Sequence, residues 1–306
     1  MTIPADLART ALLAAALLAC KARETSEPQL PLCPPLQIAA PTGEQPKPAI
    51  WLSLLLPDYD PETRRAPLPM RTCADQPIAA PVDPCSASTT SPTPAPTPAP
   101  TPIATLDDHA LVFADAGDGF LLLWAKTHRT SSGDALGPVA LVEHSPNILA
   151  VRALGMLEAP PNGTVLSLLT AGDLRYLVAE GERCPDDPPT ACLREARVLP
   201  LDGPAFVPSA YYDAHDRCLE SPRIPLFHRT PTPGLADRSV VDRRLIAVDA
   251  TGLVFQEELE FFAGDQLLRR SAETRRVDYI DGRLVVDAPS LWSRLAAHTP
   301  APESPT

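Results

Sequence analysis

The stretch ALVFADAGDGFLLLWAKT, from Ala110 to Thr127, decides the fold. Two apolar runs flank the dipeptide Asp118-Gly119, and Asp-Gly between such runs is a strong signal for a tight β-hairpin turn. Each run has the length of a strand and is short for a helix. The stretch therefore predicts two antiparallel strands joined by a tight turn.

The same pattern recurs along the chain from residue 106 to about residue 290. Strand-length runs such as PVALVEH, ILAVRALGML, RLIAVD and LVFQEELEFF alternate with turn dipeptides. The further dipeptides are Asn162-Gly163, Gly172-Asp173, Thr251-Gly252, Gly264-Asp265 and Asp281-Gly282. We therefore predict an all-β fold, a mainly antiparallel and sandwich-like meander of hairpins, with a degenerate β-propeller as the alternative. Ala-Gly-Asp occurs three times (116–118, 171–173 and 263–265) without a fixed repeat, which indicates one hairpin turn used three times.

Composition excludes some functions and constrains the core. With 306 residues, the chain is long enough to bury a proper core, and its 5% aromatic content predicts that this core is aliphatic. The net charge is −12 and no basic run occurs, so we expect no nucleic-acid binding, which requires clustered Lys and Arg. The 39 prolines are far above the average usage and gather before the β region.

Two Pro-rich segments precede the β region, and a short helix follows it. AIWLSLLLPDY (49–59) lies between prolines and is predicted as a strand, either of a small subdomain or of the main domain. SASTTSPTPAPTPAPTPIAT (86–105) is predicted as an extended spacer or a tolerated disordered insertion, because proline lacks the amide proton that a sheet needs. PSLWSRLAAH (289–298) is predicted as a short helix with proline at its start.

The N-terminus carries a signal for export. Between Arg9 and Lys21 there is no charge, and the run from Ala11 to Ala19 contains only Ala and Leu. This run is too short to span a bilayer as a helix but fits the apolar region of a secretion signal.

The end of that run resembles the lipobox of bacterial lipoprotein precursors, in the residues Leu17-Leu18-Ala19-Cys20. The resemblance implies cleavage after Ala19, a diacylglycerol on the Cys20 thiol and acylation of the new amine, with palmitate as an expected chain. The partner it implies is a membrane, bound through this lipid. Lys21 in place of Asp after the cysteine is consistent with delivery to the outer membrane. A cleaved signal without lipid and an ordinary N-terminal helix remain alternatives.

These segments predict the organisation of the chain. It is a signal peptide (1–19), a tether (20–30), a Pro-rich disulfide-containing subdomain (31–85), a Thr/Pro/Ala linker (86–105), a main β domain (106–290) and a short helix with a disordered tail (291–306).

Seven cysteines form an odd set, and assigning Cys20 to lipid leaves six that can pair completely. An exported compartment permits disulfides. We predict the pairs Cys184–Cys192, Cys73–Cys85 and Cys33–Cys218, the last by elimination. Zinc is the competing interpretation, but the spacings do not match its tight ligand pairs.

No catalytic residue, cofactor or metal is predicted. The chain has no H-E-x-x-H, G-x-S-x-G, Walker or G-x-G-x-x-G motif. Asp213, His215 and Asp216 in YYDAHDRC are candidates for a metal or acid–base site, although a solvated loop near a disulfide is favoured. The acidic turns DAGDG (115–119) and PDYDPE (57–62) match no EF-hand loop.

Tyr211 and Tyr212, in a polar loop, are the candidate ligand-binding aromatics for an envelope glycan or protein. The sequence thus predicts a lipid-anchored envelope protein with a structural, adhesion or ligand-binding role. The alternative is an exported hydrolase with two carboxylates roughly 5–9 Å apart in a concave pocket. The oligomeric state is left open.

Overall fold

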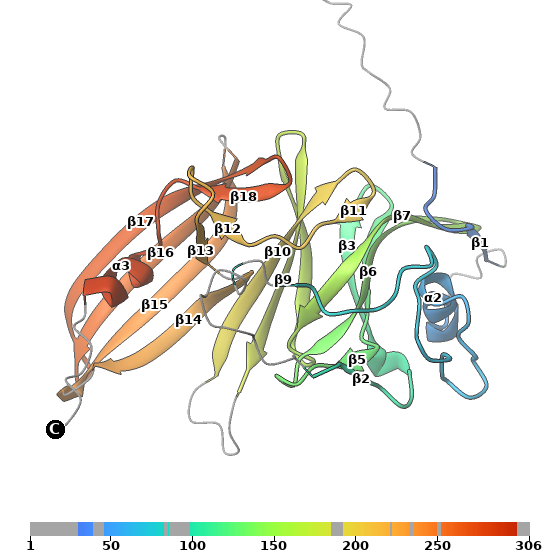
Figure 1. Cartoon of the computed structure of the whole chain (residues 1–306), viewed down its shortest axis with the longest axis horizontal. Helices are drawn as coiled ribbons and strands as arrows, with labels where there is room; N and C mark the ends of the chain where they lie inside the picture. Colours follow the sequence, from blue (N-terminus) through green and yellow to red (C-terminus); the bar gives the residue numbers. More distant parts are fainter. Residues whose placement is uncertain are drawn as a thin grey trace, which may run out of the picture. The chain divides into compact units, whose positions relative to one another are not determined.

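The computed structural model describes residues 30–38, 46–82, 85, 98–184, 192–220, 222–232, 235–249 and 252–298. Residues 31–306 form one compact unit. In the described part, eighteen strands belong to one hydrogen-bonded network, which is mostly antiparallel as predicted (Figure 1). No helix there is long and apolar enough to cross a bilayer.

The strands are β1 (Leu36–Gln37), β2 (Thr101–Pro102), β3 (Leu111–Gly117), β4 (Phe120–Ala125), β5 (His128–Arg129), β6 (Ala135–Ser145), β7 (Ile148–Ala159), β8 (Val165–Ala171), β9 (Leu174–Arg183), β10 (Leu193–Asp202), β11 (Ala205–Phe206), β12 (Tyr211–Tyr212), β13 (Cys218–Glu220), β14 (Arg223–Thr232), β15 (Leu235–Asp249), β16 (Gly252–Ala263), β17 (Gln266–Ile280) and β18 (Arg283–Val286). The helices are α2 (Pro48–Leu55) and α3 (Leu291–His298), with a 3₁₀ turn, η2, at Asp108–Ala110.

The predicted hairpin turns position most of these strands. Asp118 and Gly119 adopt the left-handed φ values of 51° and 78° that a tight hairpin requires, and they join the paired strands β3 and β4. All three Ala-Gly-Asp sequences end paired strands in this way, at β3–β4, β8–β9 and β16–β17. Asn162-Gly163 was expected to form another hairpin, and this is wrong. It connects β7 to β8, and β8 pairs with β9 instead of β7. Pro160 and Pro161 follow β7 and end its pairing, because proline has no amide proton to donate.

The strands enclose two apolar cores that share β9 and β10. Along the pairings β3–β4–β6–β7–β11–β10–β9–β8, inward side chains form the first core. The continuation β10–β14–β15–β16–β17–β18 curves over the second. In β9, Leu177 faces the first core and Val178 the second, because successive side chains point to opposite faces. This continuous pairing fits the sandwich-like prediction and does not divide into propeller blades.

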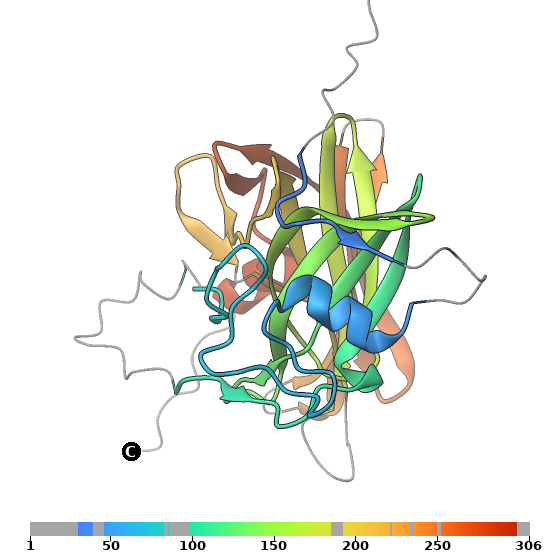
Figure 2. The same ribbon diagram turned by 90° about the vertical axis from the view of Figure 1, so that its right-hand side faces the viewer.

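Helix α2 corrects the prediction of a strand at residues 49–59. Pro48 begins the helix, and Trp51, Leu52, Leu54 and Leu55 are all buried. A helix that is apolar nearly all round must be covered on several sides, and this one packs on the outward side chains of β4, β6 and β7 (Figure 2). A short apolar run does not distinguish such a helix from a buried strand.

The disulfides confirm one predicted pair and correct two. Cys184 bonds Cys192 as expected, but the others are Cys33–Cys73 and Cys85–Cys218. The Cys73 amide donates to the Leu55 carbonyl at 2.8 Å, which brings Cys73 to the C-terminal end of α2, in the core where Cys33 is buried. Cys85 is therefore left to bond β13.

Part of the predicted linker belongs to the sheet. Residues 86–97, like the predicted signal peptide and most of the predicted tether, lie outside the described residues. At the C-terminal end of the linker, however, Thr101 and Pro102 form β2 and pair with Arg129 and His128 of β5. Proline is tolerated there because β2 is a two-residue edge strand.

Candidate functional site

Strands β14 to β17 form a curved sheet that we call the distal sheet (Figure 1). Its alternating side chains define two faces. Ile246 and Phe255 contribute to the second core, so their face is the inner one. Arg243 and Leu245 point to the outer face and are exposed.

The inner face contains a buried ionic cluster. Its members are Asp242, Arg244, Glu257 and Arg275. Arg275 Nη2 lies 2.5 Å from Glu257 Oε1, and both side chains are completely buried. Arg244 Nε lies 3.4 Å from the same Glu257 oxygen, and Arg244 Nη2 lies 3.2 Å from Asp242 Oδ2. Two cations and two anions cancel, which offsets the cost of burying each charge.

Helix α3 covers this cluster. The Leu291 amide donates to Glu257 Oε2 at 2.7 Å, and Arg275 Nη1 donates to the Ala288 carbonyl at 3.0 Å. The Ser290 hydroxyl accepts from the Ser293 amide at 3.0 Å, as an N-cap does. The predicted terminal helix is thus confirmed, beginning two residues after Pro289. Trp292 packs edge-on against His228, with ring centroids 5.6 Å apart.

The outer face carries a ladder of ion pairs in which the arginines are exposed and Glu260 is buried. Glu260 accepts from Arg270 Nη2 at 2.6 Å and from Arg243 Nε at 3.3 Å. The Arg270 hydrogen bond, followed by that of Arg243, holds the pKa of Glu260 below its usual range. Arg270 also lies 2.7 Å from Glu258. These two arginines and two glutamates neutralise one another.

A hollow of about 550 Å³ lies on this sheet. Three carboxylates line it, those of Glu257, Glu258 and Glu273. Each is ion-paired with an arginine, namely Arg275, Arg270 and Arg294 respectively. The geometry gives these groups structural partners, so it does not single them out as an acid–base pair for the hydrolase alternative.

At the β16–β17 hairpin, apolar and cationic side chains are exposed together. Leu267 and Leu268 follow the Gly264-Asp265 turn and are 44% and 50% exposed. A β-bulge between Phe261 and Phe262 interrupts the pairing beside them.

Three arginines lie in the paired segments of β14, β15 and β17 at the same end of the sheet. Arg269 lies over the Phe261 ring and Arg229 over the Phe262 ring, each 6.0 Å from the centroid, and Arg238 is exposed on β15. Arg229 donates to the Ser239 hydroxyl at 3.2 Å. Within the described residues, none of the three forms an ion pair. We call Arg229, Arg238, Leu267, Leu268 and Arg269 the hairpin rim.

The two tyrosines predicted to bind a ligand are separated by the structure. Tyr211 is fully buried and packs edge-on against Phe255, with centroids 5.3 Å apart, so it is not the exposed aromatic that was expected. The reason is that the apparent loop is β12, which pairs with β13 and β18 and turns alternate side chains inward. Tyr212 points the other way, beneath Arg283 at 5.3 Å, and its ligand role stays a prediction.

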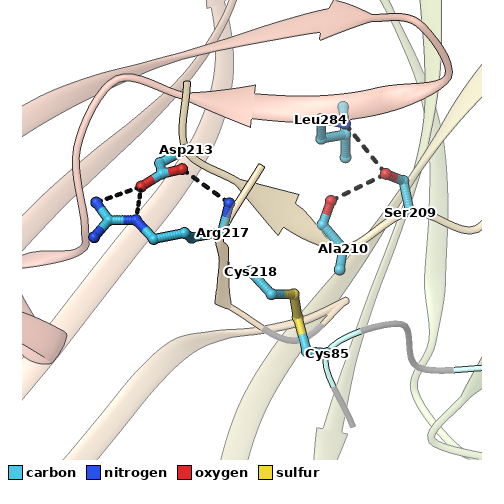
Figure 3. The surroundings of a disulfide bond; sticks show 7 residues. All are labelled: Cys85, Ser209, Ala210, Asp213, Arg217, Cys218 and Leu284. Atoms are coloured by element: carbon cyan, nitrogen blue, oxygen red, sulfur yellow. Dashed lines mark hydrogen bonds and ion pairs between the residues drawn. A yellow bond between two sulfur atoms is a disulfide. The ribbon is translucent and has the colours of Figure 1, made fainter. Parts of the chain in front are cut away.

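The turn that holds Asp213, His215 and Asp216 is a structural loop beside the Cys85–Cys218 disulfide (Figure 3). Asp213 accepts from the amides of Arg217 and His215 at 2.9 and 2.8 Å. The backbone hydrogen bond from Arg217 is the largest cause of the lowered pKa of Asp213. No group of three His, Cys, Asp or Glu side chains suited to a metal occurs in the described residues.

A second ionic cluster lies where β10 exchanges its partner β11 for β14. It comprises Asp134, Glu158, Arg183, Glu195, Arg197 and Arg223. Arg223 lies 2.5 Å from Glu158 and 2.7 Å from Asp134, and the cluster carries no net charge. Sequence reasoning missed both ionic clusters, although charged residues inside otherwise apolar strands are a signal for them.

Comparisons with protein-family models, with curated proteins and with solved structures gave no match. The faces of the distal sheet and the N-terminal motif are therefore the features that indicate a function.

Proposed function

We propose that the protein is exported and anchored to the bacterial envelope by lipid on Cys20, in the outer membrane. The lipobox-like residues Leu17 to Cys20 support this proposal. The cysteine pairing supports it too, because three disulfides use all six cysteines from Cys33 onward and leave Cys20 for modification. Two or three acyl chains give stable anchoring.

Replacing Cys20 by alanine is expected to abolish incorporation of radiolabelled palmitate and to leave the precursor uncleaved. The lipid acceptor and the cleavage signal are then removed together. The matched control is the double variant Cys184→Ser/Cys192→Ser, which loses a disulfide but keeps the lipobox and should label normally. Normal labelling and membrane fractionation of Cys20→Ala would contradict the anchor.

We further propose that the anchored domain acts by binding, with the hairpin rim as its contact surface. The observation that carries this proposal is the exposure of Leu267 and Leu268 among three arginines that form no ion pair in the described part of the chain. Adjacent exposed leucines of this kind mark surfaces that meet a partner or a membrane more often than scattered single residues do.

A photo-crosslinking amino acid at position 268 is expected to give crosslinked products in growing cells. The control position is Val165, which is 65% exposed on β8, outside the distal sheet. Crosslinks at 268 that are several-fold more abundant than at 165 would support the contact surface. Equal yields at the two positions would contradict it.

A further inference from the structure

We propose that the hairpin rim binds the surface of a membrane that contains anionic lipid. This inference rests on the binding role proposed above and names the partner. The rim joins two features that such a surface recognises together. Exposed leucines can enter the boundary between headgroups and acyl chains, and guanidinium groups can bind lipid phosphates.

The apolar part of the rim is built to protrude. Leu267 and Leu268 are the second and third residues of β17, and Leu267 pairs with Phe262 across the hairpin. The bulge places one extra residue, Leu268, on the β17 side between two paired positions. Both side chains are about half exposed at the turn end of the β16–β17 hairpin, which β15 flanks as far as Ala263, so a partner can reach them without rearrangement of the sheet.

The cationic part of the rim is held ready for phosphate. Arg229 and Arg269 each lie against the ring of a phenylalanine, which orients the guanidinium while leaving its edge for a ligand. Arg243 and Arg270, by contrast, are already occupied by Glu258 and Glu260.

Local charge supports an anionic surface as the partner. The acidic residues nearest in sequence to the rim are Asp237 and Asp265, so three arginines against two aspartates leave a charge of +1. The whole chain carries −12, so a surface segment that is not negative is distinctive. A purely acidic peptide would satisfy the arginines but not the leucines, whereas a lipid headgroup with its acyl boundary satisfies both.

The test uses residues 31–306, which hold the two cores between the strands, the apolar cluster around α2 and all three disulfides within one compact unit. This unlipidated domain is mixed with vesicles of phosphatidylcholine alone or of phosphatidylcholine with phosphatidylglycerol, and the sedimented fraction is measured. We expect binding to the anionic vesicles, weakened by salt, and little binding to the neutral ones. Leu268→Asp should weaken binding roughly tenfold, because it replaces buried apolar contact by a repelled charge.

Val165→Asp adds the same charge at an exposed site on β8 and should bind as the unaltered domain does. Circular dichroism and thermal melting check that both variants remain folded. Absence of binding to anionic vesicles, or equal weakening by the two substitutions, would overturn the inference. If crosslinks at position 268 reach only proteins while vesicles are not bound, the lipid partner is wrong but the contact surface stands.

Discussion

Replacement of Arg275 by methionine is expected to lower the free energy of unfolding by about 3–5 kcal/mol, the cost of breaking a buried ion pair. Arg275 is completely buried, and its guanidinium binds Glu257 at 2.5 Å and the Ala288 carbonyl at 3.0 Å. Methionine fills much of the same volume but leaves three charges where four had cancelled. It also removes a contact that holds the start of α3.

Urea unfolding of residues 31–306, followed by circular dichroism, measures this effect. The matched control is Arg276→Met, on the neighbouring residue, whose side chain is 50% exposed and pairs with Asp278. An exposed pair of this kind contributes about 1 kcal/mol or less. If the two variants lose the same stability, the inner cluster does not have the role assigned to it.

A double variant separates charge from packing. In Arg275→Met/Glu257→Gln, the remaining members of the cluster, Asp242 and Arg244, again cancel. We expect this variant to recover part of the stability that Arg275→Met loses, because no buried carboxylate is then left in excess. If stability recovers, the uncompensated charge causes the destabilisation of Arg275→Met. If the free energy of unfolding falls further, the hydrogen bond between Glu257 and the start of α3 is the larger contribution.

The sequence predicted the hairpins well because their signals are local. An apolar run, Asp118-Gly119 and a second apolar run specify the β3–β4 pairing without any information from elsewhere in the chain. The terminal helix was also predictable, from Pro289 and the residues after it. Helix α2 was not, because its buried surroundings come from strands about 70 to 100 residues away, and a short run of leucines fits a buried strand equally well.

The candidate site was much less predictable, because it depends on which strands become neighbours. Glu257 and Arg275 become diagonal neighbours only through the β16–β17 register, and no local sequence pattern at either residue predicts the pair. Tyr211 looked exposed for the same reason, since β18, the strand that pairs with it, lies about 70 residues further along the chain. The exposed Leu267-Leu268 pair was visible in the sequence, but within a predicted strand its exposure could not be inferred.

The cysteine pairing leads to the second large effect. Removing the Cys85–Cys218 bond, in the variant Cys85→Ser/Cys218→Ser, is expected to cost roughly 5 kcal/mol in the free energy of unfolding. The bond closes a loop with a sequence separation of 133 residues, and the entropy that a crosslink removes from the unfolded chain rises with loop length. The Cys184–Cys192 bond lies inside this loop and spans only 8 residues, so it shortens the loop very little.

That short bond provides the matched control, because Cys184→Ser/Cys192→Ser is expected to cost roughly 2.5 kcal/mol by the same relation. Both variants are unfolded in urea without reductant, after peptide mapping has shown that the other two bonds remain. If the Cys85–Cys218 bond joins the Pro-rich N-terminal segment to β13, its removal lowers the free energy of unfolding more than removal of the short bond does. Sequence-local pairing of Cys73 with Cys85 would instead make Cys85→Ser/Cys218→Ser break two bonds, and peptide mapping would then find Cys33 and Cys73 free or mispaired.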